Sequence, residues 1–211
     1  MAPQSQLFGE TLVVGRDPRQ LFLTYDDGPN DPHTLKLLDL LAKHDAKATF
    51  FLIGRYVRQR PDIARRMVAS GHAIGNHTYT HPNLIFLSSG GLARELDGCN
   101  KAIEDAVGQR PTLFRPPFGG RRPDTLSTAR KLGLLPVMWS VTSFDWKPTR
   151  PEVIAAYTER ALRKRKQGGH IVLLHDGSHA TFGADRSATV GATEMLLEKF
   201  RGSHEFVSVD S

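Results

Sequence analysis

Short apolar runs alternate along the chain with longer stretches whose apolar residues recur at helical spacing. Residues 21–24 form the first such run, and 35–44 form the first helical stretch, in which Leu37, Leu38 and Leu41 share one face. We therefore predict a strand followed by a helix. The same alternation predicts strand and helix pairs at 48–53 with 61–70, 73–76 with 92–107, 112–115 with 124–132, 135–141 with 151–166 and 171–175 with 189–200, and a last strand near 206–209.

This repeated pattern indicates an α/β fold in which helices cover a parallel sheet. About seven strands in about 200 residues fit a distorted, incomplete (β/α)7 barrel of the TIM type better than a full eight-stranded barrel. An open doubly wound sheet is the alternative. No linker, low-complexity tract or repeat of fixed period divides the sequence, so we expect one domain over residues 1–211.

Polar side chains collect where the predicted strands end. In barrels and open α/β sheets, functional groups gather at the carboxyl ends of the strands and in the loops that follow them. The sequence therefore predicts one functional rim. Its candidate side chains are Asp26, Asp27, His77, Arg115, Asp145 and His175.

The charge and cysteine content narrow the classes of partner and site. The net charge of +6 and the basic run 163–166 could indicate nucleic acid, but no aromatic residues interrupt that run to stack on bases. Cations at the end of a helix also complement its dipole. We interpret the run as a solvated surface and expect no nucleic-acid partner. The single cysteine, Cys99, excludes an internal disulfide and a cysteine-rich metal site, which leaves histidine and carboxylate as metal ligands.

Hydropathy bears on localisation. No apolar run approaches the ~20 residues that span a bilayer, and residues 1–9 lack the basic and apolar regions of a signal peptide. We expect no membrane span, and a cytoplasmic location if the chain is complete. A secreted or cell-wall location is expected instead if a signal peptide has been removed.

Asp26 and Asp27 precede Gly28 and Pro29 at the end of the first predicted strand. Neighbouring side chains on a strand point to opposite faces, and a Gly-Pro turn behind the two carboxylates would let both reach a common site. The same residues also make a good turn without any function. The motif therefore needs a partner.

His77 and His81 are four residues apart. Histidines at this spacing share a face if the segment turns helically, which is a familiar arrangement for two imidazoles on one metal. Surface histidines also fall at this spacing by chance. Together with a strand-end carboxylate, the pair would supply three ligands and leave positions open for water, as a catalytic metal site requires.

Further segments carry chemistry at the ends of later strands. Residues 114–120 place Arg115 in a loop of prolines and glycines, which can fix its position and that of a backbone N–H. Residues 139–146 bring aromatic side chains close to Asp145, and the apolar run 171–175 delivers His175. Taken singly, each segment could be structural: a strand exit, the edge of a core or a structural histidine.

The five segments, in this order, resemble the polysaccharide deacetylase family, the NodB homology domain of carbohydrate esterase family 4. The resemblance covers residues 21–209, the motif-bearing core, and five ordered motifs are far more specific than any one of them. It implies a distorted (β/α) barrel of about seven strands, in agreement with the strand pattern. It also implies a hydrolase with one divalent metal ion, usually Zn2+, with Co2+ or Ni2+ as alternatives.

The resemblance implies a role for each matching residue. Asp26 is expected to be the general base, oriented by Arg115, and His175 the general acid, tuned by Asp145. The backbone N–H of Phe118 would help to stabilise the oxyanion. The resemblance also implies that the metal ligands are Asp27, His77 and His81. The implied substrate-binding residues are Phe118, Trp146 and Leu173, and Trp146 and Leu173 would form the walls of the pocket for the acetyl methyl group.

At three positions the chain departs from the commoner family residue. Tyr25 occupies a position where Phe is commoner, and Phe118 occupies one where Tyr is commoner. Both changes are conservative. Thr142 stands where many members carry an additional Asp, so the hydrogen bonds of that Asp are lost. The expected base, ligands and acid are unaffected.

We expect an N-deacetylase that acts, as a monomer, on N-acetylglucosamine glycans such as chitin oligomers or peptidoglycan. The alternatives are an O-deacetylase on acetylated xylan, a small-molecule amidase on the same scaffold, and an inactive glycan-binding module. An inactive module would be expected to lack Asp26 or His175, and both are present here. Relatives that are small-molecule amidases usually alter the His or Asp pattern, and that pattern is complete here. The histidines outside the five segments are expected to be structural or exposed: His33, His44, His72, His170, His204 and His179, the last of which lies in the longest predicted loop, 177–191.

Overall fold

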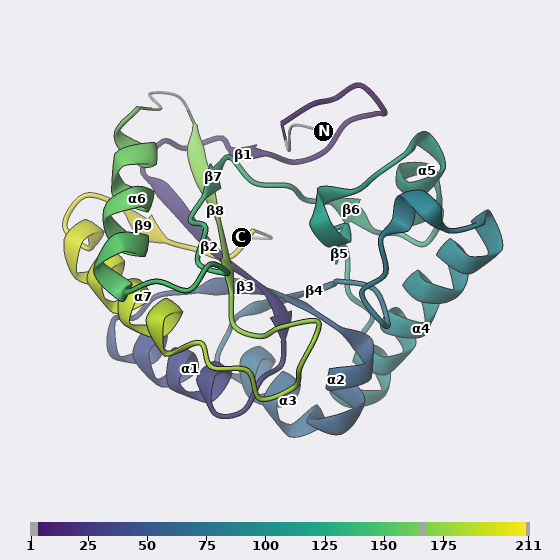
Figure 1. The fold of residues 1–211 in the computed structure, drawn as a ribbon, viewed down its shortest axis with the longest axis horizontal. Coiled ribbons are helices and arrows are strands. Elements are labelled where there is room, and N and C mark those ends of the chain that lie inside the picture. Colours follow the sequence, from purple (N-terminus) through teal and green to yellow (C-terminus); the bar gives the residue numbers. More distant parts are fainter. Residues whose placement is uncertain (1–3, 165–167, 210–211) are drawn as a thin grey trace.

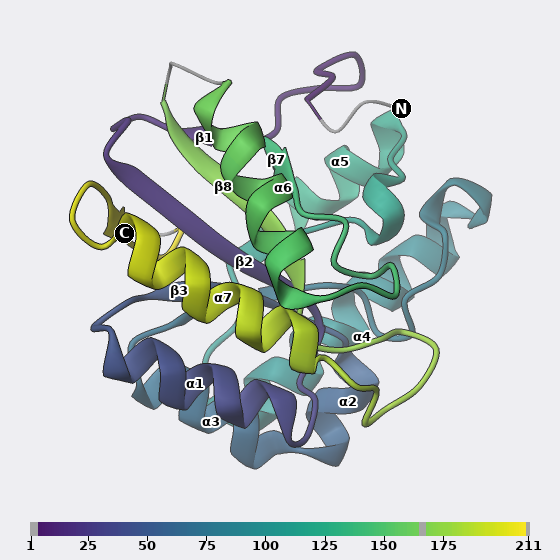
Figure 2. The ribbon, with the colours of Figure 1, turned by 60° about the vertical axis from the view of Figure 1, so that its left-hand side comes forward.

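A mostly parallel sheet curls on itself, and the helices cover its outer face (Figures 1 and 2). The computed structural model describes residues 4–164 and 168–209. The long strand β2 lies between β8 and β3 and is parallel to both. The strands are β1 (Val14–Gly15), β2 (Gln20–Gly28), β3 (Ala48–Leu52), β4 (Ala73–Asn76), β5 (Leu113–Phe114), β6 (Leu135–Pro136), β7 (Val141–Thr142), β8 (Gly169–His175) and β9 (Glu205–Phe206).

The order of the strands is that of a barrel. Parallel pairing runs β8-β2-β3-β4-β5-β6, without the reversal of strand order that an open doubly wound sheet contains. β6 pairs with β5, and β7 pairs with β8, so the segment 135–142 spans the gap between β5 and β8. The predicted distorted (β/α) barrel is confirmed, and the open sheet is wrong.

The helices follow the strands and lie outside the sheet, as the alternation predicts. Figure 2 shows α6, α7 and α1 side by side on this outer layer. None of the helices in the described ranges is both long and apolar enough to cross a bilayer. The helices are α1 (His33–Lys43), α2 (Gly54–Gln59), α3 (Pro61–Ala69), α4 (Ser89–Val107), α5 (Pro123–Lys131), α6 (Pro151–Arg163) and α7 (Ser187–Phe200), with short 3-10 turns η1 (Leu84–Phe86) and η2 (Pro117–Gly119).

The structure differs from the predicted elements in a few places. The strand predicted at 135–141 is the two short strands β6 and β7, because Leu12 pairs with Val137 and takes up the backbone between them. The unpredicted α2 has 6 residues, too few to show a helical period. The helix predicted at 151–166 ends at Arg163. Arg165 and Lys166, in the basic run, lie outside the described residues.

The two faces of β2 meet different environments. The face that carries Phe22, Thr24 and Asp26 points into the barrel, where Phe22 packs with Phe51. The barrel interior is therefore apolar near the start of β2 and polar at its carboxyl end. The other face packs against the helices through Leu21, Leu23 and Tyr25.

Phe51→Ala is expected to lower the free energy of unfolding by about 3–5 kcal/mol, because it removes a fully buried ring from the barrel interior and leaves a cavity. Urea unfolding followed by circular dichroism measures this change. Phe86→Ala removes the same atoms from a side chain that is 80% exposed, and should change the free energy by less than about 0.5 kcal/mol. Equal effects in the two variants would contradict the packing described.

Candidate active site

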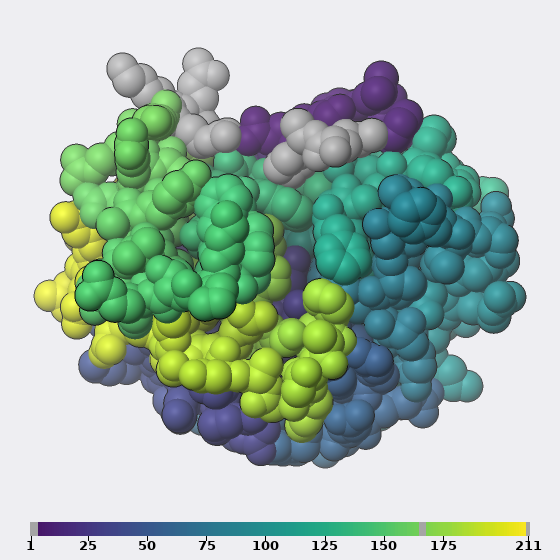
Figure 3. All heavy atoms as spheres, viewed as in Figure 1, coloured from purple at the N-terminus to yellow at the C-terminus, as the bar shows by residue number. Residues whose placement is uncertain are grey.

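A hollow of about 520 Å³ lies over the carboxyl end of β2. In Figure 3, purple atoms are visible at its floor, between the teal surface on one side, the green surface on the other and the yellow-green loop below. Arg115 and Asp145 are buried behind its wall. The other candidate residues all line it: Asp26, Asp27, His77, His81, Phe118, Trp146, Leu173 and His175.

Asp26 and Asp27 reach the same hollow because β2 is irregular at its end. Asp27 has a left-handed conformation (φ 73°), and the pairing of β2 with β3 shifts register between Asp26 and Gly28. A regular strand would point the two carboxylates to opposite faces. This bulge, rather than the Gly-Pro turn that the sequence suggested, brings them together. Gly177 is required beside it, because a Cβ there would lie 2.1 Å from the carbonyl oxygen of Asp27.

His77 and His81 meet through a loop. Residues 77–81 follow β4 and form no helix, so the helical arrangement suggested by their spacing is wrong. Thr78 (φ 68°) and His81 (φ 65°) are left-handed, and Thr78 Oγ1 accepts a hydrogen bond from the His81 N–H at 3.0 Å. The tight loop still brings the two imidazole rings together, with centroids 4.9 Å apart.

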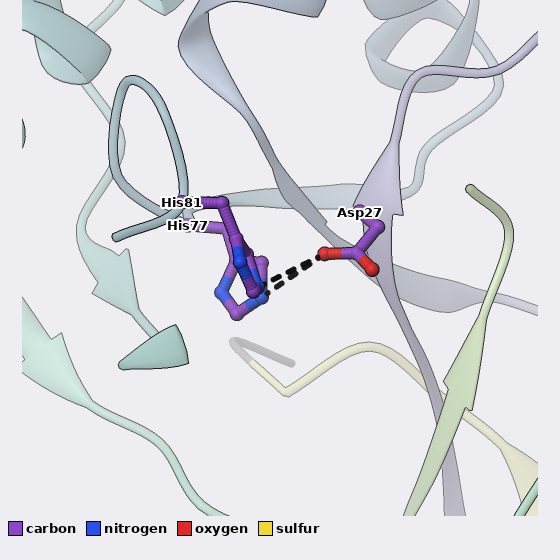
Figure 4. Close-up of side chains that lie close together, drawn as sticks. All are labelled: Asp27, His77 and His81. Atoms are coloured by element: carbon purple, nitrogen blue, oxygen red, sulfur yellow. Dashed lines mark ion pairs between the residues drawn. The ribbon is translucent and has the colours of Figure 1, made fainter. Parts of the chain in front are cut away.

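Asp27, His77 and His81 form a buried group that can hold a metal ion (Figure 4). Asp27 Oδ1 lies 3.2 Å from His81 Nε2 and 3.6 Å from His77 Nε2. This buried oxygen has no hydrogen-bond partner among the described residues, and an unsatisfied buried carboxylate oxygen is costly unless a cation meets it. His77 Nδ1 donates to the carbonyl oxygen of Arg115 at 2.7 Å, which directs Nε2 toward the group. The residues therefore fit a site with one carboxylate and two imidazole ligands.

Arg115 is fully buried beside Asp26. Its Nη1 donates to Asp26 Oδ1 at 2.8 Å, while Asp26 Oδ2 lies 3.7 Å from His77 Nε2. Burial lowers the pKa of Arg115, and the Asp26 carboxylate partly offsets this. One carboxylate oxygen is thus fixed by the guanidinium, and the other faces the metal group. The remaining guanidinium hydrogen bonds go to Thr24 Oγ1 and to the carbonyl oxygens of Val137 and Met138.

His175 ends β8 directly beside Asp26 in the sheet. Its Nδ1 donates to Asp145 Oδ1 at 2.8 Å, and its backbone N–H donates to Asp145 Oδ2 at 2.7 Å. Burial acts to lower the pKa of His175, but the charge and hydrogen bond of Asp145, with Asp27 and Asp26 nearby, outweigh it and raise the pKa to about 9. Burial acts to raise the pKa of Asp145, and the pairing with His175 holds it below its usual value. At neutral pH the imidazole is therefore cationic.

Aromatic rings stand on both sides of the hollow. Phe118 is left-handed (φ 56°) and 60% exposed, and its ring meets the edge of His81 with centroids 4.7 Å apart. On the opposite side, the Trp146 ring lies 5.4 Å from the His175 ring, and Leu173 lines the wall nearby. The walls between which a substrate would lie are thus apolar, while the floor is charged.

The departures at Tyr25 and Thr142 are accommodated by local hydrogen bonds. The Tyr25 hydroxyl lies on the helix-facing side of β2 and bonds with Thr193 Oγ1 at 3.0 Å. Thr142 Oγ1 accepts from Trp139 Nε1 at 2.9 Å. Thr142 thus fixes an indole that itself lines the hollow.

His179, which was expected to be structural or exposed, is exposed and also contacts the metal group. It lines the hollow, its backbone N–H donates to Asp27 Oδ2 at 3.2 Å, and its ring stacks on His81 with centroids 4.3 Å apart. The Arg55 side chain donates to the His179 carbonyl, and the Tyr56 hydroxyl donates to the Ser178 carbonyl at 3.0 Å. The position of His179 in the loop after His175 was the signal in the sequence that pointed to it.

The same loop contains Asp185 and Arg186. Arg186 lines the hollow and donates to the Gly177 carbonyl at 2.6 Å. Asp185 pairs with His33 Nε2 at 3.0 Å, so it ties the loop to the start of α1. The other histidines outside the motifs do not line the hollow: His44, His72, His170 and His204.

Comparison with known proteins shows the family to which the chain belongs. The family model described as polysaccharide deacetylase matches residues 14–137. The chain belongs to this family. It is 42% identical over 164 residues to a chitooligosaccharide deacetylase of Rhizobium leguminosarum bv. trifolii, covering 78% of this chain and 74% of that protein. It is also similar to the structure of the peptidoglycan deacetylase PdaC from Bacillus subtilis, with a TM-score of 0.78, 30% identity, and coverage of 92% and 90% of the two chains.

Another similar structure shows what the fold alone does not decide. It is a variant, with restored enzymatic activity, of a pseudoenzyme of carbohydrate esterase family 4 from Bacillus anthracis. The TM-score is 0.83 at 30% identity, and the match covers 95% of this chain and 70% of that one. One fold thus carries both active and inactive members, so the side chains in the hollow carry the argument for activity.

His77→Ala is expected to weaken binding of a divalent ion by more than about 100-fold, which exceeds the 10- to 100-fold effect typical of groups that only support a ligand. Titration calorimetry with Zn2+ on the metal-free protein measures the affinity. His72→Ala removes a buried imidazole that lies outside the metal group, and should leave the affinity unchanged. A His77→Ala protein that binds zinc as tightly as the unaltered chain would refute the ligand set.

Asp145→Asn is expected to move the basic limb of the kcat/KM profile to lower pH by more than about one unit, because one unit corresponds to 1.36 kcal/mol of lost interaction. An acid must be protonated to act, so activity falls as pH rises through the pKa of His175, and Asp145 is what raises that pKa. A bound cation would lower the pKa in both proteins, so the comparison between them holds. Asp185→Asn is the control, and an unchanged basic limb in Asp145→Asn would contradict the pairing.

Proposed function

We propose that the protein is a metal-dependent hydrolase that removes N-acetyl groups from N-acetylglucosamine-containing glycans. The observation that carries the proposal is the arrangement of Asp26 and His175 on adjacent strands, beside the Asp27, His77 and His81 group and in one hollow. The Asp26 carboxylate is fixed by Arg115, and the His175 ring is fixed by Asp145. A base and an acid separated in this way can divide the proton transfers of amide hydrolysis.

The metal group supplies the electrophilic part of the site. We propose that Asp27, His77 and His81 hold one divalent ion, with Zn2+ as the first choice because two imidazoles and a carboxylate are ligands that it favours. A bound zinc ion lowers the pKa of a water and polarises a carbonyl. Co2+ and Ni2+ suit the same ligands and are the alternatives.

The protein side chains move the protons. Asp26, held by Arg115 and not part of the metal group, is placed to take a proton from the attacking water. His175 is placed to give a proton to the departing nitrogen, and Asp145 keeps it protonated until then. The Phe118 N–H has no acceptor among the described residues, so it is available to donate to the oxygen that becomes negatively charged.

The walls of the hollow fit an acetyl group on a sugar. Trp146 and Leu173 are proposed to surround the methyl group, because they provide apolar surface beside His175. The relatives named above are described as acting on chitooligosaccharides and peptidoglycan, and both polymers contain N-acetylglucosamine. The expectation of a monomer stays a prediction, which the elution volume in size-exclusion chromatography tests.

The experiment that tests the function offers the zinc-loaded protein three substrates: chitooligosaccharides, peptidoglycan fragments and acetylated xylan. Mass spectrometry then detects the loss of acetyl groups. Loss from either of the first two is the expected result. Loss of acetyl groups from xylan alone would indicate an O-deacetylase. Loss from none of the three substrates would contradict the proposal and favour a small-molecule amidase or an inactive module.

Asp26→Asn is expected to lower kcat by about 10²- to 10⁴-fold, the usual contribution of a general base, while zinc affinity changes little because Asp26 is outside the metal group. Acetate release and calorimetry measure the two quantities on one preparation. Asp185→Asn, which alters a carboxylate paired with His33 instead, should retain the full rate. Near-normal turnover in Asp26→Asn would show that another group accepts the proton.

A further inference from the structure

A row of aromatic rings leaves the hollow and crosses the surface to α6. Trp146 lines the hollow, its ring centroid lies 5.2 Å from that of Phe144, and the Phe144 centroid lies 5.0 Å from that of Tyr157 on α6. Trp146 is 42% exposed and Tyr157 is 48% exposed. The apolar surface beside the site is therefore continuous with the site itself.

Phe144 occupies a strained backbone conformation that puts its ring in this row. Its φ of 58° is left-handed, which is unfavourable for a bulky residue. Asp27, His81 and Phe118 share this property, and all three line the hollow. Strain of this kind persists where the surrounding structure enforces it, so the ring of Phe144 is held in place between Trp146 and Tyr157.

A second hollow of about 370 Å³ lies along this row. Phe144, Lys147 and Tyr157 line it together with Val153, which is 47% exposed. The Lys147 ammonium lies 5.1 Å from the centroid of the Phe144 ring. This hollow therefore combines aromatic faces with a positive charge.

The charged side chains beside this row of aromatic rings include cations without a carboxylate partner among the described residues. Arg160 and Lys164 line an adjoining hollow of about 560 Å³ that shares Tyr157, and within the described ranges no carboxylate pairs with either of them. Arg163, in contrast, is neutralised by Glu159 at 2.5 Å. Glu152 is a carboxylate close to these cations, because it lines a further hollow together with Tyr157 and Arg160.

We propose that this α6 surface, formed by Phe144, Lys147, Tyr157, Arg160 and Lys164, binds further units of the glycan chain whose acetyl group lies in the active-site hollow. Aromatic rings offer apolar faces for the C–H faces of sugars at little conformational cost. The cations select, among N-acetylglucosamine glycans, those that carry carboxylates over neutral ones. The inference rests on the proposed function and narrows its substrate class.

The aromatic part is tested with Tyr157→Ala and the conservative variant Tyr157→Phe. For chitopentaose, Tyr157→Ala should raise KM about tenfold, the change expected from one good interface residue, with kcat unchanged because no proton-transferring residue is altered. For chitobiose, which is too short to occupy both places, KM should not change. Tyr157→Phe keeps the ring and should behave as the unaltered protein. An unchanged KM for chitopentaose in Tyr157→Ala would overturn the proposal.

The charged part is tested with the double variant Arg160→Ala with Lys164→Ala. Glycan strands prepared from peptidoglycan, whose sugars carry carboxylates, are compared with chitooligosaccharides of equal length. At low salt, the double variant should raise KM about fivefold for the peptidoglycan strands. The rise should be smaller at high salt, because exposed charges are screened. KM for the chitooligosaccharides should not change. Arg94→Ala, which removes an exposed arginine from α4, is the matched control. Equal losses for both glycans would show that the cations do not select carboxylates.

A binding measurement separates this inference from the proposed function. Calorimetry on zinc-loaded Asp26→Asn, with and without Tyr157→Ala, gives the affinity for chitopentaose without turnover. If the unaltered protein deacetylates no glycan, the proposed function fails on that result alone. If it does deacetylate glycans and Tyr157→Ala leaves this affinity unchanged, only the α6 surface is refuted.

Discussion

The buried guanidinium of Arg115 is the constraint on which the site depends. A cation in a barrel interior is costly unless a counter-charge and hydrogen-bond acceptors surround it. Asp26 supplies the charge, and Thr24 and two carbonyl oxygens from the segment that closes the barrel supply the acceptors. The carbonyl oxygen of Arg115 also fixes the ring of His77. One residue therefore couples barrel closure to the positions of the base and of one metal ligand.

The second principle of the site is local strain enforced by the barrel. Asp27, His81 and Phe118 are all left-handed residues other than glycine, and each conformation costs free energy that its surroundings must offset. The bulge at Asp27 turns two successive carboxylates to one side, and the left-handed Thr78 and His81 fold two histidines onto one carboxylate oxygen. Chemistry that a regular strand or helix could not assemble is obtained in this way.

Electrostatics then separates the roles of groups that share the hollow. The pairing of Asp145 with His175 outweighs the effect of burial and produces an imidazolium and a carboxylate in place of two neutral groups. Asp26 is bound to a cation that is always charged, and Asp27 keeps one oxygen without a hydrogen-bond donor. Outside the hollow, the row of rings runs from Trp146 through Phe144 to Tyr157 on α6, where Arg160 and Lys164 line the adjoining surface.

The sequence by itself determined the alternation of strands and helices, the barrel, and the rim on which Asp26, His77 and His175 stand, because hydrophobic periodicity and strand ends are local features of the chain. It also pointed to the ligand set through residue types and their order. Only the tertiary structure decided how those residues meet. The bulge at Asp27, the non-helical loop of His77 and His81, and the packing of His179 over the metal group depend on backbone pairing and contacts between segments far apart in the chain. Such pairing is a property of the assembled barrel, so no local pattern of residues could encode it visibly.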